Sequence, residues 1–579
     1  APGMSRNREV AALFDELADR LEAQDGSFRP RAYRNAADAI RQVTAPIETL
    51  AADGPEALEA IDGVGEATAA KVLEYLETGQ IATLEEERDA VPVDMQALQR
   101  VEGLGPKRVY ALYAALEITD LDELEAAAEA GEIQTVEGFG PKTEATIREQ
   151  IEFARSASAR TPIGRVYPLA EDVVAHLRAH EAADEVALAG SIRRWRATIG
   201  DIDVLVATSK ADSVTDHLVG WDRTAEVLQT GATKTSVRVG GQQVDLRVVD
   251  PDSFGAALQY FTGSKAHNVR LRNRALDRGL TMNEYGIFEL DGDGEEGARV
   301  AGTTETSMYE AVGLPSIPPE LREDRGEIAA AAEEELPTLI TTADIRGDLH
   351  THTTASDGRA SITAMLEEAE QRGYEYYAVC DHASGPGVVA GMGLDDEALL
   401  AHADAVREAA ADVDLTVLTG VETNITTDGE LSTGDSALEA LDCVVASPHS
   451  ALDQDRETAT DRIIRAIEHP MVDIIGHPTG MRRSQREGLP IDIEAVASAA
   501  ADAQTALEVN ANPARLDLRS TYVRVAVDAG ATVVINTDAH ATDQLELMRY
   551  GVHTARRGWA TAEAVLNTWD VAAVTEFCH

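Results

Sequence analysis

The sequence predicts a multidomain protein that combines α+β and α/β architecture, and three observations lead to this prediction. The chain has 579 residues, which is too long for a single hydrophobic core. Residues 1–155 read as short amphipathic helices broken by glycine-containing turns, and residues 160–318 mix strands with helices. From about residue 346 onward, apolar runs alternate with helical segments, which indicates repeated β/α units in a parallel barrel or a doubly wound sheet.

The charge of the chain is strongly negative, with a formal net value of −52 at pH 7. Only six of the 50 basic residues are lysines, a bias that resembles proteins of extreme halophiles; an ordinary acidic protein is the alternative. Such acidity normally argues against nucleic-acid binding, because phosphate contacts require lysine and arginine. In molar salt that attraction is largely lost in any case, so short-range hydrogen bonds would have to contribute more. The hydrophobic fraction of 44% favours folded domains over disorder.

Two classes of protein are disfavoured by what the sequence lacks. It has no signal-peptide pattern and no apolar run of roughly eighteen residues, so we expect a cytoplasmic protein without a membrane partner. We also expect a monomer. The three cysteines, Cys380, Cys443 and Cys578, are too widely spaced to suggest a disulfide framework or a zinc ribbon.

A glycine motif recurs three times in the N-terminal helical region, as "IDGVGEATAAKVLEYL" (61–76), "VEGLGPKRVYALY" (101–113) and "VEGFGPKTEATI" (136–147). A single G-x-G could belong to a dinucleotide-binding loop, but that loop follows a strand and these copies follow helical segments. The three copies resemble helix-hairpin-helix motifs, in which glycines expose the N–H groups of a helix N-terminus to a nucleic-acid phosphate. A plain helical hairpin with a glycine turn is the alternative. The resemblance implies DNA contacts at Gly63, Gly65, Gly103 and Gly105.

Two segments with alternating polarity place three aspartates on one face of a predicted sheet. In "DIDVLV" (201–206) Ile202, Val204 and Val206 can face the core, while Asp201 and Asp203 share the opposite face. The segment "QQVDLRVVD" (242–250) repeats the alternation and points Asp245 outward. If the two strands are neighbours, the three carboxylates converge and need cations between them, which predicts a two-metal site for Mg²⁺ or Mn²⁺. The alternative is a pair of solvent-facing acids on an edge strand.

The same region resembles the palm of family X DNA polymerases, a nucleotidyltransferase domain with a mixed sheet. The resemblance rests on "GS" at Gly190, "RR" at Arg193 and "GDID" at Gly200. The segment "YFTGSKAHNVRLRNRALDRGLTMNEYGIF" (260–288) resembles the nucleotide-selecting subdomain of that family. The family pattern implies that the catalytic metal ligands are Asp201, Asp203 and Asp245. It also implies that the nucleotide is bound by Gly190, Ser191, Arg194, Tyr260, Phe261, Gly263, Asn268 and Arg272.

Trp195 departs from the family pattern, which usually has glycine after the arginine pair. A large ring at this position is expected to reshape the loop that meets the triphosphate, and with it the position of Arg194.

The first helices resemble the small lyase domain of the same family. The segment "SFRPRAYRNAADAI" (27–40) carries this resemblance, which implies that Arg29 and Tyr33 bind a 5′-phosphate in a gap. Lys71 aligns with the lysine that forms a Schiff base with deoxyribose phosphate in the animal enzymes. Ala67 takes the place of a basic residue of that pocket, which argues against lyase chemistry; Lys71 would then be an ordinary solvated helix residue.

The C-terminal part is rich in histidine, because ten of the fourteen histidines lie beyond residue 341. Seven apolar runs read as strands, and six of them end in a candidate metal ligand. In a β/α barrel the carboxyl ends of the strands meet at one mouth, so these side chains should cluster there. Histidine together with carboxylates suits Zn²⁺, Mn²⁺ or Fe²⁺, whereas a lone histidine at a strand end is more often structural.

The positions of these side chains resemble the polymerase-and-histidinol-phosphatase (PHP) domain, a distorted (β/α)7 barrel. That resemblance implies three divalent ions (Mn²⁺, Zn²⁺ or Fe²⁺), with Glu422 bridging two of them. Asp357 follows His352 after a tight turn, which would carry it to the third ion. The implied metal ligands are His350, His352, Asp357, His382, Glu422, His449, His477, Asp538 and His540.

Together these features lead to one functional hypothesis, a family X DNA polymerase for gap filling in DNA repair, fused to a PHP phosphoesterase. The barrel would act as a metal-dependent 3′–5′ exonuclease that processes 3′ ends, with abasic-site cleavage as a further activity to test. The substrates would be gapped or primer-template DNA and dNTPs. The expected domains are 1–85 (lyase-like), 86–158 (helical DNA-binding), 159–250 (palm), 251–318 (nucleotide-selecting), 319–345 (a charged helical linker) and 346–579 (PHP barrel).

Two alternatives remain at this point. The first is a small-molecule phosphatase of the histidinol-phosphate kind tethered to a degenerate polymerase, and the intact aspartate triad argues against it. The second is a non-catalytic DNA-end scaffold that uses the hairpins for binding alone, and the nine intact barrel ligands argue against that.

Overall fold

The chain divides after Thr161 into two units, Ala1–Thr161 and Pro162–His579, in the computed structural model. The structure describes residues 4–578 apart from 24–28, 43–46, 53, 62, 79, 100, 102–103, 159, 232, 291–295, 389–391 and 484–485. None of the helices in these described residues is long and apolar enough to cross a membrane. The six predicted segments are finer than this division, and their boundaries stay predictions.

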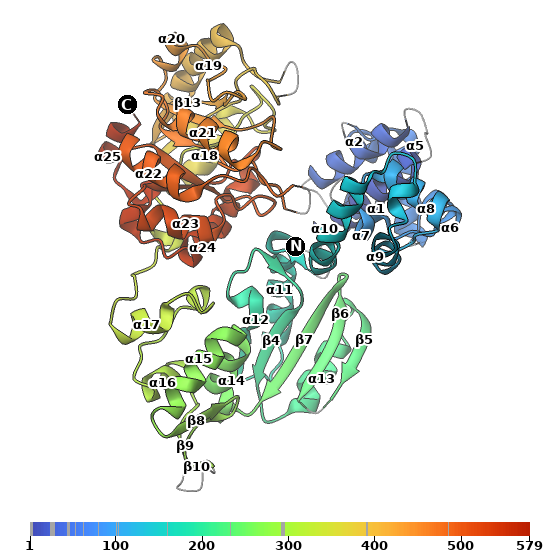
Figure 1. Cartoon of the computed structure of the whole chain (residues 1–579), viewed down its shortest axis with the longest axis vertical. Helices are drawn as coiled ribbons and strands as arrows, with labels where there is room; N and C mark the ends of the chain where they lie inside the picture. The colour runs from blue at the N-terminus through green and yellow to red at the C-terminus, as the bar shows by residue number, and fades with distance from the viewer. Residues whose placement is uncertain are drawn as a thin grey trace. The chain divides into compact units, whose positions relative to one another are not determined.

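The first unit is helical, as the sequence predicts (Figure 1). Its helices are α1 (Met4–Ala23), α2 (Arg29–Gln42), α3 (Ile47–Ala52), α4 (Pro55–Glu59), α5 (Glu66–Thr78), α6 (Ala82–Ala90), α7 (Met95–Leu98), α8 (Pro106–Leu116), α9 (Leu121–Ala130) and α10 (Pro141–Ser158), with the 3-10 turn η1 (Ile133–Thr135). Arg20 in α1 donates hydrogen bonds to the carbonyls of Val91 (2.8 Å) and Val93 (3.1 Å). This buried arginine therefore joins the regions predicted as two separate N-terminal domains.

A five-stranded mixed sheet begins the second unit. Its strands, in spatial order, are β2 (Glu185–Leu188), β4 (Ile202–Ala207), β7 (Gln242–Val249), β6 (Lys234–Val239) and β5 (Thr224–Thr230). β4 and β7 are parallel neighbours, and the other pairs are antiparallel. The helices α11 (Ile163–Arg178) and α13 (Ala211–Val219) pack on the sheet, because their apolar residues share one core with Val204 and Val206. The short elements β1 (Thr161–Pro162), α12 (Gly190–Arg193) and β3 (Thr198–Ile199) complete this region.

A smaller α+β region follows. It contains η2 (Pro251–Ser253), α14 (Phe254–Thr262), α15 (Lys265–Leu276), α16 (Glu305–Ala311) and an antiparallel sheet of β8 (Leu280–Asn283), β9 (Gly286–Leu290) and β10 (Glu296–Ala301). Helices and sheet share a core that includes Ala256, Leu271 and Ile287.

Residues 319–345, all of which are described, differ from the charged helical linker that their composition predicts. Within them only α17 (Glu327–Ala332) is an α-helix, between the 3-10 turns η3 (Pro319–Leu321) and η4 (Thr342–Asp344). Glu320, Arg322 and Glu327 are 4%, 1% and 0% exposed, so their charges are buried rather than solvated. Glu320 pairs with Arg556 and Arg322 pairs with Glu305. A local charge pattern cannot reveal such distant partners.

Seven parallel strands in sequence order form the C-terminal barrel, as predicted. They are β11 (Gly347–Asp348), β12 (Tyr376–Val379), β13 (Thr416–Asn424), β14 (Cys443–Ser447), β15 (Ile474–Ile475), β16 (Ala506–Asn510) and β17 (Val533–Asn536). A parallel bridge between Thr351 and Ala539 links the ends of β11 and β17 and nearly closes the barrel. The surrounding helices are α18 (Ile362–Gln371), α19 (Asp396–Ala409), α20 (Asp435–Leu438), α21 (Arg456–Ile467), α22 (Ile493–Ala503), α23 (Ser520–Asp528), α24 (Met548–Arg557) and α25 (Val571–Phe577).

Candidate metal centres

The three predicted aspartates of the palm region come together on β4 and β7. Asp203 lies directly opposite Asp245 in the parallel register, and one carboxylate oxygen each of Asp201, Asp203 and Asp245 lies within 4.8 Å of the other two. The alternating residues Val204 and Leu246 are buried, as the sequence pattern predicts. The strands are therefore neighbours, which was the condition for a two-cation site.

Gly190, the first residue of α12, allows the start of this segment to approach the triad. Its φ is +60°, and a Cβ added there would lie 1.9 Å from Oδ2 of Asp203. Any side chain at this position would collide with the carboxylate, so glycine is required for the close approach. The predicted nucleotide-binding loop thus lies against the predicted metal ligands.

The electrostatics of the triad favour a bound cation. Burial, followed by the charges of Asp201 and Asp245, raises the pKa of Asp203 to about 7. Burial also opposes ionisation of Asp245, but hydrogen bonds from Lys234 and Gln243 lower the pKa of Asp245 overall. Lys234 Nζ lies 2.6 Å from Asp245 Oδ2. The sequence analysis missed Lys234, and its rarity as one of six lysines is a weak signal that could have marked it.

The two arginines of the loop have different partners. Both oxygens of Glu305 accept from Arg193, at 2.7 and 2.8 Å, so Arg193 is held in a bidentate ion pair. Arg194 donates to the carbonyl of Thr262, and its Nε lies 3.1 Å from Glu323. Because Gly263 follows Thr262, Arg194 is the arginine that lies beside the predicted nucleotide-binding turn.

The remaining predicted nucleotide-binding residues lie on α14 and α15. The rings of Tyr260 and Phe261 meet edge to face at 5.1 Å, and the Arg247 guanidinium lies 4.1 Å above the Phe261 ring. Asn268 donates to the carbonyl of Tyr260 at 2.7 Å. Arg272 is exposed on α15. Ser191, in α12, is partly buried.

Two of the predicted DNA-binding glycines of the first unit directly precede helices. Gly65 precedes α5 and donates its N–H to Thr68 Oγ1 at 2.9 Å, while Gly105 precedes α8 and is exposed. Gly63 has a φ of +94°. Gly103 and the side chain of Arg29 lie outside the described residues. Half-buried Tyr33 packs edge-on against Phe14 at 5.8 Å, and Lys71 Nζ donates to Thr83 Oγ1 at 2.7 Å.

The predicted barrel ligands converge around Glu422 at the carboxyl ends of the strands. Three groups have ligand atoms within 4.8 Å of one another: His352, Asp357, His382 and His540; His350, His352 and Asp538; and His382, Glu422 and His449. The ninth predicted ligand, His477, places its Nε2 3.0 Å from Glu422 Oε1. The structure therefore brings eight of the nine predicted ligands together in three overlapping groups, and it places the ninth, His477, against Glu422.

Several buried atoms of the predicted ligands make no hydrogen bond, which fits the binding of cations at this site. Five imidazole nitrogens lie 2.7–3.6 Å from the Glu422 oxygens. Within the described part of the chain, the two Glu422 oxygens accept no hydrogen bond. The buried Nε2 atoms of His350, His352 and His449 also make none. A carboxylate and imidazoles without hydrogen bonds are costly to bury unless an ion satisfies them.

Side chains that the sequence analysis missed fix the orientation of the ligands. Glu508 accepts from His350 Nδ1 at 2.7 Å and from the N–H of His477 at 2.6 Å. The side-chain carbonyl of Asn424 lies 2.7 Å from His449 Nδ1. The bond from His477 is made by its main-chain N–H, whereas His350 and His449 use Nδ1, so Nε2 of these two rings is left for a metal. The signal for Glu508 was a carboxylate inside the apolar run "ALEVNAN", the one run without a predicted ligand.

Asp381 fixes the tight turn that carries Asp357. It is fully buried and accepts hydrogen bonds from Thr353 N–H (2.8 Å), Thr353 Oγ1 (2.7 Å) and Ser356 Oγ (2.5 Å). His402 Nε2 lies 2.8 Å from the same carboxylate. The turn thereby places Asp357 3.2 Å from His540 and 3.5 Å from His382.

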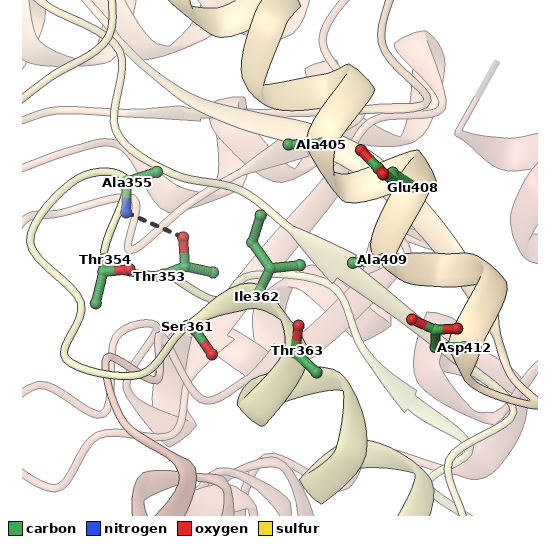
Figure 2. Close-up of a pocket in the computed structure, with 10 residues that line it drawn as sticks. All are labelled: Thr353, Thr354, Ala355, Ser361, Ile362, Thr363, Ala405, Glu408, Ala409 and Asp412. Atoms are coloured by element: carbon green, nitrogen blue, oxygen red, sulfur yellow. Dashed lines mark hydrogen bonds between the residues drawn. The ribbon is translucent and has the colours of Figure 1, made fainter.

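A pocket of about 450 Å³ lies between this turn and α19. Figure 2 shows Thr353, Thr354 and Ala355 on one side and Glu408 and Asp412 on the other. None of the nine predicted metal ligands is among its ten described lining residues, and its charged groups are both acids. The pocket is therefore separate from the metal centre and unsuited to a phosphate group.

A basic residue lies at the edge of the barrel centre. Arg515 Nε is 3.6 Å from Asp538 Oδ2, and its side chain is 10% exposed. Burial, and then the Arg515 charge, lowers the pKa of His477 to about 4. A lowered pKa favours the neutral imidazole, which is the form that binds a metal.

Comparisons with known proteins agree with this geometry. Residues 257–323 match the family model of the DNA polymerase beta thumb, and residues 348–512 match the PHP domain. Residues 5–81 match a helix-hairpin-helix domain, and residues 95–152 match a SAM-like helix-hairpin-helix tandem. The DNA polymerase/3′-5′ exonuclease PolX of Bacillus subtilis (strain 168) is 35% identical over 575 residues, which cover 98% of this chain and 99% of that protein.

The chain belongs to the family X DNA polymerases that carry a PHP domain. The resemblance and the fold class inferred from the sequence are therefore confirmed. The individual residue roles stay predictions.

Shorter relatives of this family X chain have a different name. A probable phosphatase of Shewanella sp. (strain MR-4) is 33% identical over 209 residues, which are 34% of this chain and 77% of that protein. A probable phosphatase of Thermoanaerobacter sp. (strain X514) is 30% identical over 242 residues, 40% of this chain and 93% of that protein. These relatives bear on which phosphoester the barrel hydrolyses.

Proposed function

We propose that the chain is a template-directed DNA polymerase that fills gaps, and that its barrel is a metal-dependent 3′–5′ exonuclease acting on the same DNA ends. The observation that carries the proposal is the placement of Asp203 opposite Asp245 on neighbouring parallel strands. Burial and the two neighbouring charges raise the pKa of Asp203 to about 7, so ionising all three carboxylates costs free energy unless cations bind between them. The name of the Bacillus subtilis relative supports the same pair of activities.

In the polymerase site, Asp201, Asp203 and Asp245 would hold Mg²⁺ or Mn²⁺. Divalent cations at this site and in the barrel would supply Lewis-acid stabilisation of phosphate charge and lower the pKa of the attacking hydroxyl or water. Gly190, Ser191 and Arg194 would bind the triphosphate, and Gly263 would let the turn beside Arg194 approach it. Tyr260 and Phe261 would lie against the sugar, while Asn268 and Arg272 would reach the nascent base pair.

In the barrel, the nine ligands would hold three divalent ions, which we expect to be Mn²⁺, Zn²⁺ or Fe²⁺ from the mixed histidine and carboxylate set. Arg515, 3.6 Å from the ligand Asp538, would bind a phosphate oxygen of the terminal nucleotide. Asp381, by fixing the turn, would keep Asp357 in place while the substrate enters.

The first unit would bind the gapped DNA. Gly63, Gly65, Gly103 and Gly105 would contact phosphates through backbone N–H groups, and the Gly65 N–H would exchange its bond to Thr68 Oγ1 for one to the phosphate. Arg29 with Tyr33 would bind the 5′-phosphate. Lys71 is the candidate for lyase chemistry. Borohydride trapping of a gapped abasic substrate tests it, and equal trapping by wild type and Lys71→Ala would remove this lysine from the mechanism.

A second candidate function is hydrolysis of a small phosphomonoester by the barrel, because two relatives are named probable phosphatases. The two functions differ in substrate. Rates on p-nitrophenyl phosphate and histidinol phosphate, measured beside rates on a 3′-labelled oligonucleotide, distinguish them.

The decisive experiment is primer extension and 3′ digestion of a gapped duplex with Mn²⁺, assayed on three proteins. Wild type should do both. Asp201→Ala with Asp203→Ala should lose extension and keep digestion, whereas His350→Ala should lose digestion and keep extension. Absence of both activities on DNA in the wild type would refute the proposal and leave the phosphatase or the scaffold. The same assay on abasic DNA tests abasic-site cleavage, and light scattering tests the predicted monomer.

A further inference from the structure

The barrel helix α24 contacts the nucleotide-binding loop of the palm region through an aromatic stack. The ring of Trp195 lies between Tyr167 of α11 and His553 of α24, with ring centroids 4.3 and 3.6 Å away and interplanar angles of 25° and 5°. Tyr550, also on α24, meets the Trp195 ring edge-on at 5.9 Å. The residue that follows the arginine pair is thus held by the barrel.

The backbone conformation of Trp195 is unusual for a residue with a large side chain. Its φ is +53°, in the left-handed region that glycine adopts most readily and that a bulky aromatic residue rarely adopts. Glycine would be the conformationally easier choice at this turn. The stacking of the Trp195 ring on His553 and Tyr167 offsets that cost. The contact with the barrel therefore helps to hold the loop in this conformation.

Arg557, the last residue of α24, reaches the same loop through polar contacts. It donates to the main-chain carbonyl of Arg194, and its Nη2 lies 3.1 Å from Glu323 Oε1. Arg194 Nε lies 3.1 Å from that same oxygen. The side chains of Arg557 and Glu323 are only 7% and 8% exposed, so solvent screens these interactions little.

Positive charge exceeds negative charge around Glu323. Arg194, Arg196 and Arg557 all pair with this one carboxylate. Three guanidinium groups around one carboxylate leave a surplus of positive charge beside the loop that lies against Asp203. If Arg557 were removed, Glu323 would neutralise a larger share of Arg194, and less positive charge would face an arriving triphosphate.

We propose that Arg557 and His553 of the barrel are positioning residues of the polymerase site, which fix the loop from Gly190 to Trp195 and the charge around Arg194. This proposal rests on the proposed function, because it takes the substrate to be a nucleoside triphosphate. The barrel then contributes to nucleotide affinity independently of its own hydrolytic centre.

Primer extension on a gapped duplex over a series of dNTP concentrations tests the proposal in the full chain. Arg557→Met should raise KM for the dNTP roughly tenfold or more with a smaller change in kcat, because charge-assisted contacts to the loop are lost. Arg557→Lys keeps the charge but loses the two-point contact, so it should recover part of the affinity. Trp195→Gly suits the backbone but removes the stack, and should also raise KM.

Two controls make the outcome decisive. Arg372→Met removes an arginine that pairs with Glu368 at the end of α18, and its KM should equal that of wild type. Digestion of 3′ ends reports that the barrel of each variant is folded. If Arg557→Met also loses digestion, the substitution has disrupted the fold. The KM of Trp195→Gly then tests the proposal: a raised KM supports it and a wild-type KM contradicts it.

Failure of this proposal differs from failure of the proposed function. Wild-type KM values in Arg557→Met and Trp195→Gly, with digestion retained, would overturn the positioning role and leave the polymerase function intact. A wild type that extends no primer with any dNTP would overturn both.

Discussion

Glu508 and His350 form a buried hydrogen-bonded pair behind the predicted metal centre of the barrel. Glu508 Oε1 lies 2.7 Å from His350 Nδ1, and both side chains are 0% exposed. The same carboxylate accepts from the N–H of His477 at 2.6 Å and from Asn536 at 3.2 Å. A partner of this kind fixes the tautomer and the orientation of a ligating ring.

Glu508→Gln is therefore expected to impair the barrel alone. The amide turns one hydrogen-bond acceptor into a donor facing the N–H of His350 or His477, which should lower metal affinity and 3′ digestion by about 10–100-fold. Primer extension should not change. Metal content by mass spectrometry and digestion rates over a Mn²⁺ titration measure the effect. Glu494→Gln, on the exposed face of α22, is the matched control, and wild-type digestion by Glu508→Gln at limiting Mn²⁺ would contradict the role.

Asp203→Asn is expected to stabilise the metal-free protein at high pH. Burial and then the charges of Asp201 and Asp245 raise the pKa of Asp203 from its ordinary 3.8 to about 7. A carboxyl with a raised pKa contributes stability that is complete below the unfolded-state pKa and is lost as the pH rises through about 7. With EDTA at pH 8 the variant should unfold a few degrees above wild type, a difference that shrinks towards pH 4.

Thermal unfolding followed by circular dichroism measures this difference. The exposed Asp222→Asn in the same region should show no such dependence on pH. Added Mn²⁺ should reverse the order of the two proteins, because wild type binds the ion more tightly. A variant less stable than wild type in EDTA at pH 8 would show that the triad does not repel itself.

The patterns that the sequence predicted correctly are local ones. Alternation in "DIDVLV" is enough to put Asp201 and Asp203 on one face, and a ligand at a strand end is enough to place His449 or Asp538 at the mouth of a barrel. The register that sets Asp203 opposite Asp245 depends on which strands pair, which no local pattern states. The sequence could therefore show that a metal site would form if the two strands were neighbours, but not that they are neighbours.

The residues that the sequence analysis missed act over long separations in the chain. Glu508 lies within its strand rather than at the end, and its partner His350 follows the first strand of the barrel, β11. Arg322 reads as a solvated charge until Glu305 is placed beside it. Trp195 was recognised as a departure from the family pattern, but its stacking partner His553 lies in the last third of the chain.

Glu305→Gln is expected to destabilise the second unit in a way that depends on pH. Burial opposes ionisation of Glu305, but hydrogen bonds and charges of Arg193 and Arg322 lower its pKa from 4.5 to about 2. A carboxyl with a lowered pKa contributes stability that is present above pH 4.5 and is lost as the pH falls towards about 2. The substitution should cost roughly 3 kcal/mol at pH 7, because the buried Arg322 and the partly buried Arg193 lose their partner.

Urea unfolding at pH 7 and pH 3 measures this cost. The difference between Glu305→Gln and wild type should be smaller at pH 3, where protonation begins to remove the same charge from the wild type. Glu310→Gln, exposed on the same helix α16, should unfold as wild type at both pH values. A difference that does not vary with pH would mean that the substitution acts through packing alone.

Concentrated KCl is expected to stabilise the whole chain. A formal charge of −52 on 579 residues makes the folded state repel itself, and salt screens that repulsion. The midpoint of thermal unfolding should therefore rise between about 0.2 and 3 M KCl. Sorbitol stabilises proteins by exclusion from their surface without screening charge, so it separates the two effects. A midpoint that rises in sorbitol but stays level or falls in KCl would show that self-repulsion does not limit the stability of this chain.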